Sequence, residues 1–212
     1  MKFCKDMLLL YAVSDRSWVG NQTLYERIED ALKGGITCLQ LREKNLSFDE
    51  FVKEAIIVKE ICRRYNVPLI INDNAEVARK SGADGVHVGI EDAPIRELRR
   101  KFPDNFIIGA TAKTVKQAMD AEKAGADYIG VGAVFPSPTK KNAIRITSEQ
   151  LKEICSKVSI PAVAIGGINL DNMSELTGGG MDGIAVVSAI FASEDIQKTT
   201  AMLKEKAKAL II

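Results

Sequence analysis

The chain has 212 residues, of which 46% are apolar and 27% are charged. This composition is sufficient for one substantial hydrophobic core, and it excludes a disordered chain and a small domain held together by disulfides. The 29 Lys and Arg residues nearly balance the 28 Asp and Glu residues. The overall charge therefore gives no reason to expect a nucleic-acid or membrane partner, and any anion-binding site must be local.

The four cysteines are far apart and lack the Cys-x-x-Cys spacing of a zinc or redox site. We expect reduced thiols at Cys4, Cys38, Cys62 and Cys155. The apolar run at residues 7–13 is short and is followed by no small-x-small cleavage site, which favours a first core strand over a signal peptide. Because no run approaches the roughly 20 residues that span a bilayer, we expect a cytoplasmic protein with one domain over residues 1–212. Homo-oligomerisation stays open.

Eight short apolar runs alternate with segments of helical periodicity. The runs are residues 7–13, 37–41, 69–71, 85–88, 106–110, 128–131, 162–165 and 183–187. The clearest helical segments are residues 24–33, 48–65, 115–124 and 148–157. Strands separated by helices run parallel, so the pattern predicts an α/β fold, a (β/α)8 TIM barrel with about 26 residues in each unit. A doubly wound open sheet is the alternative, but no Gly-x-Gly-x-x-Gly follows the first run.

A short glycine-containing phrase recurs before every second predicted strand. It is found at residues 34–37, 82–85, 125–128 and 180–183. A glycine in the left-handed conformation, followed by a short turn, is what a helix leading directly into a strand requires. These glycines are therefore predicted to be structural, and the repeat supports the count of eight strands.

Polar residues that follow the predicted strands are the candidates for chemistry, because active sites of parallel barrels lie at the carboxyl ends of the strands. The first cluster is the run Gln40-Leu41-Arg42-Glu43-Lys44. Its alternation directs Leu41 toward the helices and Gln40, Arg42 and Lys44 toward the barrel interior. Two inward cations with no acidic partner on that face favour a bound polyanion over a solvated strand end.

Two aspartates follow neighbouring strands and form the second cluster. Asp73 follows the third predicted strand and Asp92 follows the fourth, so the two carboxylates can approach one another. Mg²⁺ is commonly held by one or two carboxylates together with substrate phosphates. Helix capping is the alternative for each aspartate. The lone histidine, His87, lies within an apolar strand, where a packed, hydrogen-bonded ring is more usual than a catalytic one.

The remaining loops add hydroxyls, lysines and glycines. Thr111 follows the fifth predicted strand, and the sixth is followed by a proline-stiffened loop at residues 135–141 that contains Ser137, Thr139 and Lys140. The pair Gly166-Gly167 and the pair Val187-Ser188 follow the last two strands, where barrels often bind phosphate. No recognisable Ser/His/Asp spacing is present and no cysteine has an activating partner, so covalent catalysis is not expected.

These motifs together resemble the thiamine-phosphate synthase family over residues 11–190. The phrases that carry the resemblance are residues 40–44, 71–73, 82–89, 125–132, 138–140, 164–168 and 187–190. The resemblance implies a TIM-barrel transferase of thiamine biosynthesis with Mg²⁺ as cofactor. Such an enzyme joins 4-amino-2-methyl-5-hydroxymethylpyrimidine diphosphate to hydroxyethylthiazole phosphate, and it releases thiamine phosphate and pyrophosphate.

The resemblance also implies a role for each site residue. The pyrimidine diphosphate would be held by Gln40, Arg42, Lys44, Asn72, Thr111 and Lys140, with Leu41 and Glu43 in the same substrate-binding run. Mg²⁺ would be bound by Asp73 and Asp92, and the catalytic cations would be Arg42, Lys44 and Lys140. The thiazole phosphate would be held by Ser137, Thr139, Gly167, Val187 and Ser188. Ile90 and Ala133 depart from the family pattern, which usually has glutamine and proline there.

Two other functions stay open from the residues alone. One is a cofactor-free isomerase of a small phosphorylated metabolite, with an Asp or His as base. The other is a non-catalytic module that senses a thiamine precursor. Mg²⁺ dependence and pyrophosphate release would separate the transferase from both. The related thiazole tautomerases look similar overall but lack the full set of metal-binding and diphosphate-binding residues.

Overall fold

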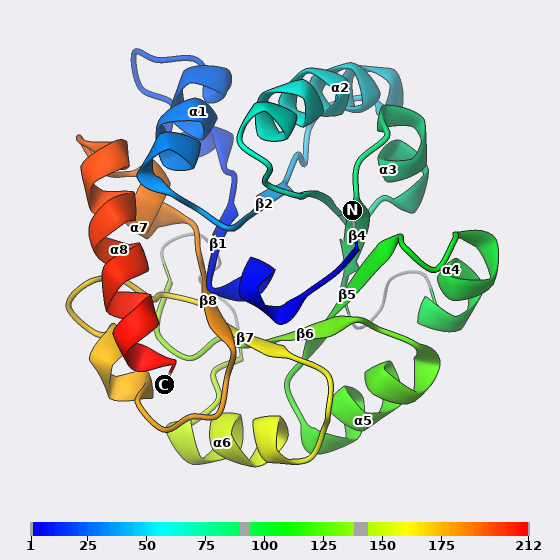
Figure 1. Cartoon of the computed structure of the whole chain (residues 1–212), viewed down its shortest axis with the longest axis vertical. Helices are drawn as coiled ribbons and strands as arrows, with labels where there is room; N and C mark the ends of the chain where they lie inside the picture. Colours follow the sequence, from blue (N-terminus) through cyan, green and yellow to red (C-terminus); the bar gives the residue numbers. More distant parts are fainter. Residues whose placement is uncertain (1, 90–93, 138–143, 212) are drawn as a thin grey trace.

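The computed structural model describes residues 2–89, 94–137 and 144–211. In these ranges, eight parallel strands pair in chain order and close into a barrel through the pairing of the first with the last (Figure 1). The strands are β1 (Leu10–Val13), β2 (Cys38–Leu41), β3 (Leu69–Asn72), β4 (Gly85–Val88), β5 (Ile107–Ala112), β6 (Tyr128–Gly132), β7 (Ala162–Ile165) and β8 (Gly183–Val186). The predicted TIM barrel is confirmed, and the open-sheet alternative is excluded by the closure.

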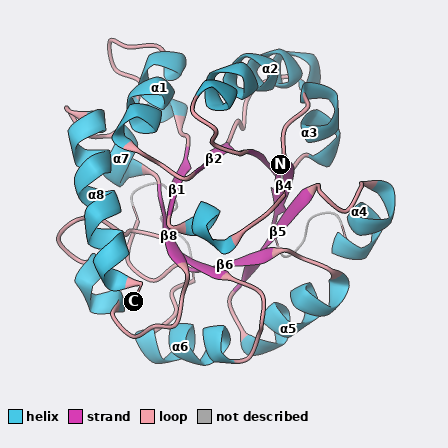
Figure 2. Cartoon of the chain, in the orientation of Figure 1, coloured by secondary structure: helices cyan, strands magenta, loops and turns pink. Residues whose placement is uncertain are grey.

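Helices form a layer around the outside of the barrel (Figure 2). They are α1 (Leu24–Gly34), α2 (Phe48–Arg64), α3 (Ala75–Ser81), α4 (Ile95–Lys101), α5 (Val115–Ala124), α6 (Ser148–Ser156), α7 (Ser188–Phe191) and α8 (Ile196–Leu210). In the described ranges three 3-10 helices accompany them, namely η1 (Lys5–Leu8), η2 (Arg16–Trp18) and η3 (Met173–Leu176). Capping boxes, in which a Thr or Ser pairs with a Glu or Gln three residues later, begin α1, α2 and α6 and satisfy otherwise unpaired amide groups.

Two strand boundaries differ from the sequence prediction in an informative way. The predicted first strand began at residue 7, but that part of the run belongs to η1, and β1 begins at Leu10. The predicted fifth strand ended at residue 110, but β5 continues to Ala112 because Thr111 and Ala112 pair with β6. Backbone pairing with a neighbouring strand sets both boundaries, and local hydrophobicity does not report that pairing.

The core consists of two apolar layers separated by the barrel wall. Outward side chains such as Leu39, Leu41 and Ile71 pack against the helices, whereas inward ones such as Tyr11 and Tyr128 fill the barrel. Both layers are almost fully buried. The alternation follows from the two-residue period of a strand, and it determines which polar residues can reach the barrel interior.

The repeated phrase organises the amino-terminal rim of the barrel. Gly35, Gly82 and Gly125 each end a helix with a positive φ, as predicted. In the fourth phrase, Gly180 also has a positive φ, but it lies four residues beyond the end of η3. The last polar residue of each phrase accepts a hydrogen bond from the start of the preceding odd-numbered strand, namely Thr37 from Leu10 N (2.9 Å), Asp84 from Leu69 N (2.8 Å), Asp127 from Ile108 N (2.7 Å) and Asp182 from Ala162 N (3.0 Å).

Two of these aspartates also form ion pairs. Lys59 Nζ lies 2.6 Å from Asp84 Oδ2, and Arg99 Nη2 lies 2.6 Å from Asp127 Oδ2. Each carboxylate is therefore shared between a strand amide and a helix cation. The repeat thus ties the helix layer to the start of the barrel, which is a stabilising role.

In the described part of the chain, no helix combines the length and the apolar character that crossing a bilayer requires. All four cysteines are free thiols, and Cys38 and Cys62 are buried. Burial raises the pKa of the Cys62 thiol to about 12, so this group stays protonated at neutral pH and acts as an apolar core residue.

Candidate functional site

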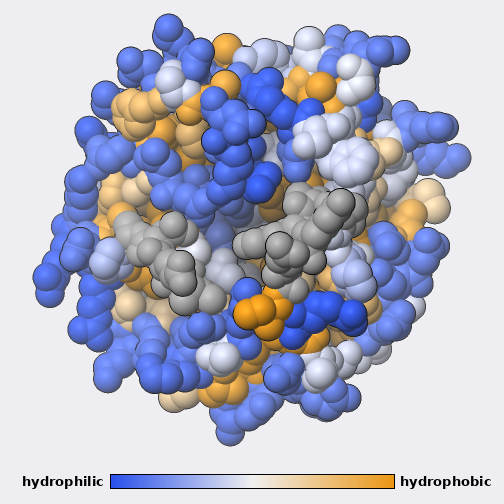
Figure 3. All heavy atoms as spheres, turned by 180° about the vertical axis from the view of Figure 1, so that it is seen from behind, coloured by the Kyte–Doolittle hydropathy of each residue, from blue (hydrophilic) through white to orange (hydrophobic). Residues whose placement is uncertain are grey.

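A cavity of about 420 Å³ opens at the carboxyl-terminal rim of the barrel. Its lining includes most of the described residues in the predicted site, namely Gln40, Arg42, Lys44, Asn72, Asp73, Thr111, Ser137, Gly167, Val187 and Ser188. These residues come from six different strand ends and the loops that follow them. Figure 3 shows the molecule from the side opposite to Figure 1, where hydrophilic side chains dominate the surface. The barrel geometry thus brings together residues that are up to 148 positions apart in the chain.

Two residues of the predicted binding run lie outside this cavity. Leu41 is fully buried between the barrel and the helices. Glu43 accepts a hydrogen bond from Arg16 at 3.0 Å, and its side chain is only 4% exposed. Three further predicted site residues, Asp92, Thr139 and Lys140, lie outside the described residues, as does Ile90.

Arg42 and Lys44 face carboxylates from neighbouring strands. Lys44 Nζ lies 2.9 Å from Asp73 Oδ2, and Arg42 Nη1 lies 3.6 Å from Asp15 Oδ2. The expectation that these cations lack an acidic partner is therefore wrong. The acidic partners follow β3 and β1, so they could not be predicted from the spacing of residues on β2. The side chains of Lys44 and Asp73 are 51% and 37% exposed, and an exposed pair of this kind contributes at most about 1 kcal/mol, so a polyanion can replace Asp73 at little cost. Asp15, in contrast, is nearly buried and also accepts a hydrogen bond from Ser17 N.

Asp73 is not used as a helix cap. The side chain of the next residue, Asn74, caps α3 by accepting a hydrogen bond from Val77 N at 3.0 Å. Asp73 itself has a φ of 62°, a left-handed conformation that is uncommon outside glycine, and its amide donates to His87 O at 2.8 Å. Such conformations cost about 1 kcal/mol or more and tend to occur at functional sites. The carboxylate therefore remains available to the cavity, where it contacts Lys44.

His87 is held by hydrogen bonds on both ring nitrogens. Its Nδ1 lies 3.1 Å from Tyr128 Oη, and its Nε2 lies 3.1 Å from Thr111 Oγ1. Burial lowers the pKa of His87 to about 4, with a smaller opposing effect from the negative charge of Asp73. The ring is therefore neutral at pH 7, which fits the sequence-based preference for a packed, hydrogen-bonded imidazole.

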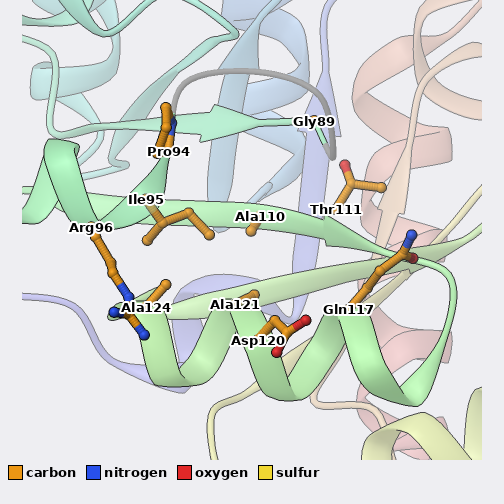
Figure 4. A pocket seen from close by; sticks show the side chains of 10 residues that line it. All are labelled: Gly89, Pro94, Ile95, Arg96, Ala110, Thr111, Gln117, Asp120, Ala121 and Ala124. Carbon is orange, nitrogen blue, oxygen red and sulfur yellow. The ribbon is translucent and has the colours of Figure 1, made fainter.

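A second cavity, of about 340 Å³, lies on the outer side of β5 between α4 and α5 (Figure 4). Apolar atoms of Ile95, Ala110 and Ala121 line it, with Arg96 and Asp120 among the charged residues. Its described lining comes mainly from the two helices rather than from several strand ends. The rim cavity, which gathers cations, a carboxylate and hydroxyls, is therefore the candidate active site.

Comparisons with known proteins identify the family of this chain. A family model described as thiamine monophosphate synthase matches residues 10–190. The thiamine-phosphate synthase of Clostridium novyi is 49% identical over 189 residues, which cover 89% of this chain and 93% of that protein. The chain belongs to the thiamine monophosphate synthase family. The corresponding protein of Clostridium botulinum is 45% identical over 197 residues, covering 93% of this chain and 92% of that one.

A solved structure extends the likeness to three dimensions. The thiamine phosphate pyrophosphorylase of Pyrococcus furiosus superposes with a TM-score of 0.90 at 38% identity, covering 98% of this chain and 99% of that one. The family resemblance inferred from the motifs is confirmed. As a member of the thiamine monophosphate synthase family, the chain is a transferase of thiamine biosynthesis.

The cavity of this family member also contains residues that the sequence reasoning missed. Tyr11, Val13 and Lys113 line it. Tyr11 and Val13 alternate along β1 and could have been identified from the two-residue strand period. Lys113 directly follows Ala112, and it was missed because the fifth strand was predicted to end two residues too early. It adds a third described cation to the lining of the site.

Proposed function

We propose that this chain joins 4-amino-2-methyl-5-hydroxymethylpyrimidine diphosphate to hydroxyethylthiazole phosphate in the rim cavity, and that residues 1–212 form one catalytic domain in the cytoplasm. The observation that carries the proposal is the convergence of Arg42, Lys44 and Asp73 on one cavity of a barrel that matches the family over residues 10–190. The four free thiols support the cytoplasmic location.

The diphosphate part of the first substrate is assigned to the cationic side of the cavity. Arg42 and Lys44 follow β2, and Lys140 joins them by family resemblance. Negative charge increases on the diphosphate as its bond to the pyrimidine methylene carbon breaks, so fixed cations stabilise the transition state more than the ground state. Gln40, Asn72 and Thr111 complete this binding region with hydrogen-bonding groups.

Mg²⁺ fits the same region. Asp73 presents a carboxylate that is 37% exposed and is not used for capping, and Asp92 is its proposed partner. Carboxylate oxygens are the protein ligands that Mg²⁺ prefers. Among the described residues no group of three or more His, Cys, Asp or Glu side chains could hold a metal ion, so the proposed ion is held by Asp73, Asp92 and the substrate. When bound, Mg²⁺ would supply further positive charge to the leaving diphosphate.

The thiazole phosphate is assigned to the opposite side, formed by Ser137, Gly167, Val187 and Ser188, and Thr139 is added by family resemblance. Gly167 has a φ of 69°, and a Cβ at this position would lie 2.2 Å from Pro136 O. Only glycine therefore fits, because the preceding loop occupies the space where a side chain would lie. The hydroxyls and amides of this set suit a phosphate.

Among the described residues that line the site, His87 has no ring nitrogen free to act as a base. Both ring nitrogens of His87 are hydrogen-bonded and the ring is neutral at pH 7, which argues against an isomerase that uses this histidine as base. The electron-rich aminopyrimidine can stabilise the cation that forms at its methylene carbon. The protein then needs to hold the thiazole nitrogen in line with that carbon and to keep the diphosphate neutralised.

An assay of pyrophosphate release with both precursors tests the proposal. We expect equal amounts of thiamine phosphate and pyrophosphate, and no pyrophosphate when the thiazole phosphate is left out or when Mg²⁺ is removed with a chelator. An isomerase would release no pyrophosphate under any of these conditions. A precursor-sensing module would bind the substrates without turnover, and either result would overturn the proposal.

A further inference from the structure

Five side chains form a continuous hydrogen-bonded chain through the interior of the barrel. The chain runs from Gln40 Nε2 to Tyr11 Oη (2.9 Å), to Tyr128 Oη (2.8 Å), to His87 Nδ1 (3.1 Å), and from His87 Nε2 to Thr111 Oγ1 (3.1 Å). Its two ends, on β2 and β5, line the rim cavity, whereas Tyr128 lies deeper, within the inner apolar layer. The chain thus joins two proposed substrate-binding residues through a buried centre.

Two glycines make room for the rings of this chain. A Cβ on Gly109 would lie 2.2 Å from the Tyr128 ring, and a Cβ on Gly130 would lie 3.1 Å from the His87 ring. The two rings are therefore seated against bare backbone on β5 and β6, with their centroids 5.5 Å apart. Side chains packed this closely have few alternative rotamers, so the hydrogen-bonded chain is fixed by the barrel.

The donor and the acceptor of each of these hydrogen bonds can be assigned by starting from Gln40. A phenol has one hydrogen and a neutral imidazole has one N–H. Because the Gln40 amide donates to Tyr11, the hydrogen of Tyr11 is free to bond Tyr128, and the hydrogen of Tyr128 then bonds His87 Nδ1. His87 must carry its proton on Nε2 and donate to Thr111. If the hydrogen bonds ran in the opposite direction, the hydroxyl hydrogen of buried Tyr11 would have no acceptor among these five side chains. An unpaired buried donor is costly.

We propose that Tyr128 is a positioning residue that holds His87 as the Nε2–H tautomer, so that Gln40 presents its carbonyl oxygen and Thr111 its hydroxyl hydrogen to the substrate. This inference rests on the proposed function, in which both residues contact the pyrimidine diphosphate. A carbonyl oxygen suits the amino group of an aminopyrimidine, and a hydroxyl hydrogen suits an anionic diphosphate oxygen. These buried hydrogen bonds thereby favour a ligand that has a hydrogen-bond donor facing Gln40 and an acceptor facing Thr111.

Nitrogen-15 NMR of the full chain labelled at histidine tests the tautomer directly, because His87 is the only histidine. We expect a protonated Nε2 and an unprotonated Nδ1. In Tyr128→Phe, Nδ1 loses its donor, and we expect the Nδ1–H form to increase. In Tyr11→Phe, Tyr128 still donates to His87, so the tautomer is retained. A dominant Nδ1–H form in the unmodified chain, or no change in Tyr128→Phe, would overturn the proposal.

Steady-state kinetics separate positioning from a merely structural role. Tyr128→Phe should raise the KM for the pyrimidine diphosphate about fivefold to tenfold, the size expected for one misdirected hydrogen bond, and leave the KM for the thiazole phosphate unchanged. Tyr25→Phe is the matched control, because Tyr25 Oη donates to Glu54 at 3.0 Å, away from the rim cavity. Equal effects of the two variants would contradict positioning by Tyr128.

The two readouts also separate this inference from the proposed function. If the unmodified chain releases no pyrophosphate, the proposed function fails, and with it the substrate contacts that the positioning requires. If the chain is active but His87 is the Nδ1–H tautomer, only the positioning role is overturned.

Discussion

The two rims of the barrel use aspartate in opposite ways. At the amino-terminal rim, Asp127 accepts from Ile108 N at 2.7 Å and pairs with Arg99 at 2.6 Å. At the carboxyl-terminal rim, Asp73 pairs with Lys44 at 2.9 Å, and the side chain that caps the next helix belongs to Asn74. Both carboxylates contact a cation, but only Asp127 also satisfies a strand amide.

This difference distinguishes a structural carboxylate from a functional one in this fold. A carboxylate that holds a strand amide cannot be given up without loss of stability, so it is unsuitable for a ligand that comes and goes. A carboxylate whose described partner is one accessible lysine can exchange that partner for a metal or a substrate.

Replacing Asp73 should have the largest effect on catalysis. We expect Asp73→Ala to lower turnover by about 100-fold or more, the scale of losing one preorganised transition-state contact, without unfolding the barrel. The rate of pyrophosphate release and a far-ultraviolet circular dichroism spectrum measure both quantities. Lys140→Ala, at a residue outside the described ranges, should have an effect of similar size.

Asp30→Ala is the matched control for this experiment. Asp30 also pairs with a lysine, Lys33 at 3.3 Å, and its exposure of 31% is close to the 37% of Asp73. It lies on α1, away from the cavity, so its loss should leave turnover unchanged. Near-normal turnover in folded Asp73→Ala would remove Asp73 from the site.

Replacing Asp127 should have the opposite signature. Asp127→Ala leaves Ile108 N without its acceptor and removes the ion-pair partner of Arg99, which keeps its hydrogen bonds to Gly125 O and Phe106 O. We expect the free energy of unfolding to fall by about 2 kcal/mol. Turnover of the folded enzyme should stay within twofold of normal. Urea denaturation gives the stability, and Asp104→Ala, at an exposed residue before β5, serves as control. A stable but inactive Asp127→Ala would contradict the distinction between the rims.

Replacing His87 should have a smaller effect than replacing Asp73. We expect His87→Asn to lower kcat/KM by about tenfold, because it breaks the hydrogen bonds to Tyr128 and Thr111 but removes no charge from the transition state. Measuring both variants under the same conditions gives the order directly. If His87→Asn were the more severe change, His87 would have to act as a catalytic base.

The pH dependence of stability should show the smallest effect. The pKa of His87 is about 4 in the folded chain, below its ordinary value of 6.5, so the unfolded chain binds the proton first. The His87 contribution to the free energy of unfolding is therefore complete above pH 6.5 and is lost as the pH falls toward 4. The difference between the unmodified chain and His87→Asn, measured by urea denaturation across this range, should show the loss. A flat difference would mean that the pKa is not lowered.

Much of the fold could be predicted from the sequence because it depends on local periodicity. The alternation of apolar runs and helical segments identified the barrel, and the repeated phrases marked its even-numbered strands. The role of Asp84, Asp127 and Asp182 was not predicted, because their hydrogen-bond partners lie on strands 15 to 20 residues earlier. Patterns within a segment do not specify contacts between segments.

The sequence likewise predicted only part of the candidate site. The inward face of residues 40–44 and the polar strand ends follow from the strand period, and the cavity brings them together. The partners of Arg42 and Lys44 could not be predicted, since they depend on which strands are neighbours at the rim. The hydrogen bonds that connect Tyr11 and Tyr128 to the site were also missed, because the sequence does not distinguish two buried tyrosines from ordinary core residues.

The different roles of Asp73 and Asp127 are tested most directly by the Mg²⁺ dependence of pyrophosphate release, measured in parallel for the unmodified chain, Asp73→Ala and Asp127→Ala at a temperature where all three are folded. We expect that release by the unmodified chain and by Asp127→Ala requires Mg²⁺ over the same concentration range, whereas Asp73→Ala is at least about 100-fold slower. Release that is independent of Mg²⁺, or one dependence shared by all three proteins, would contradict this expectation.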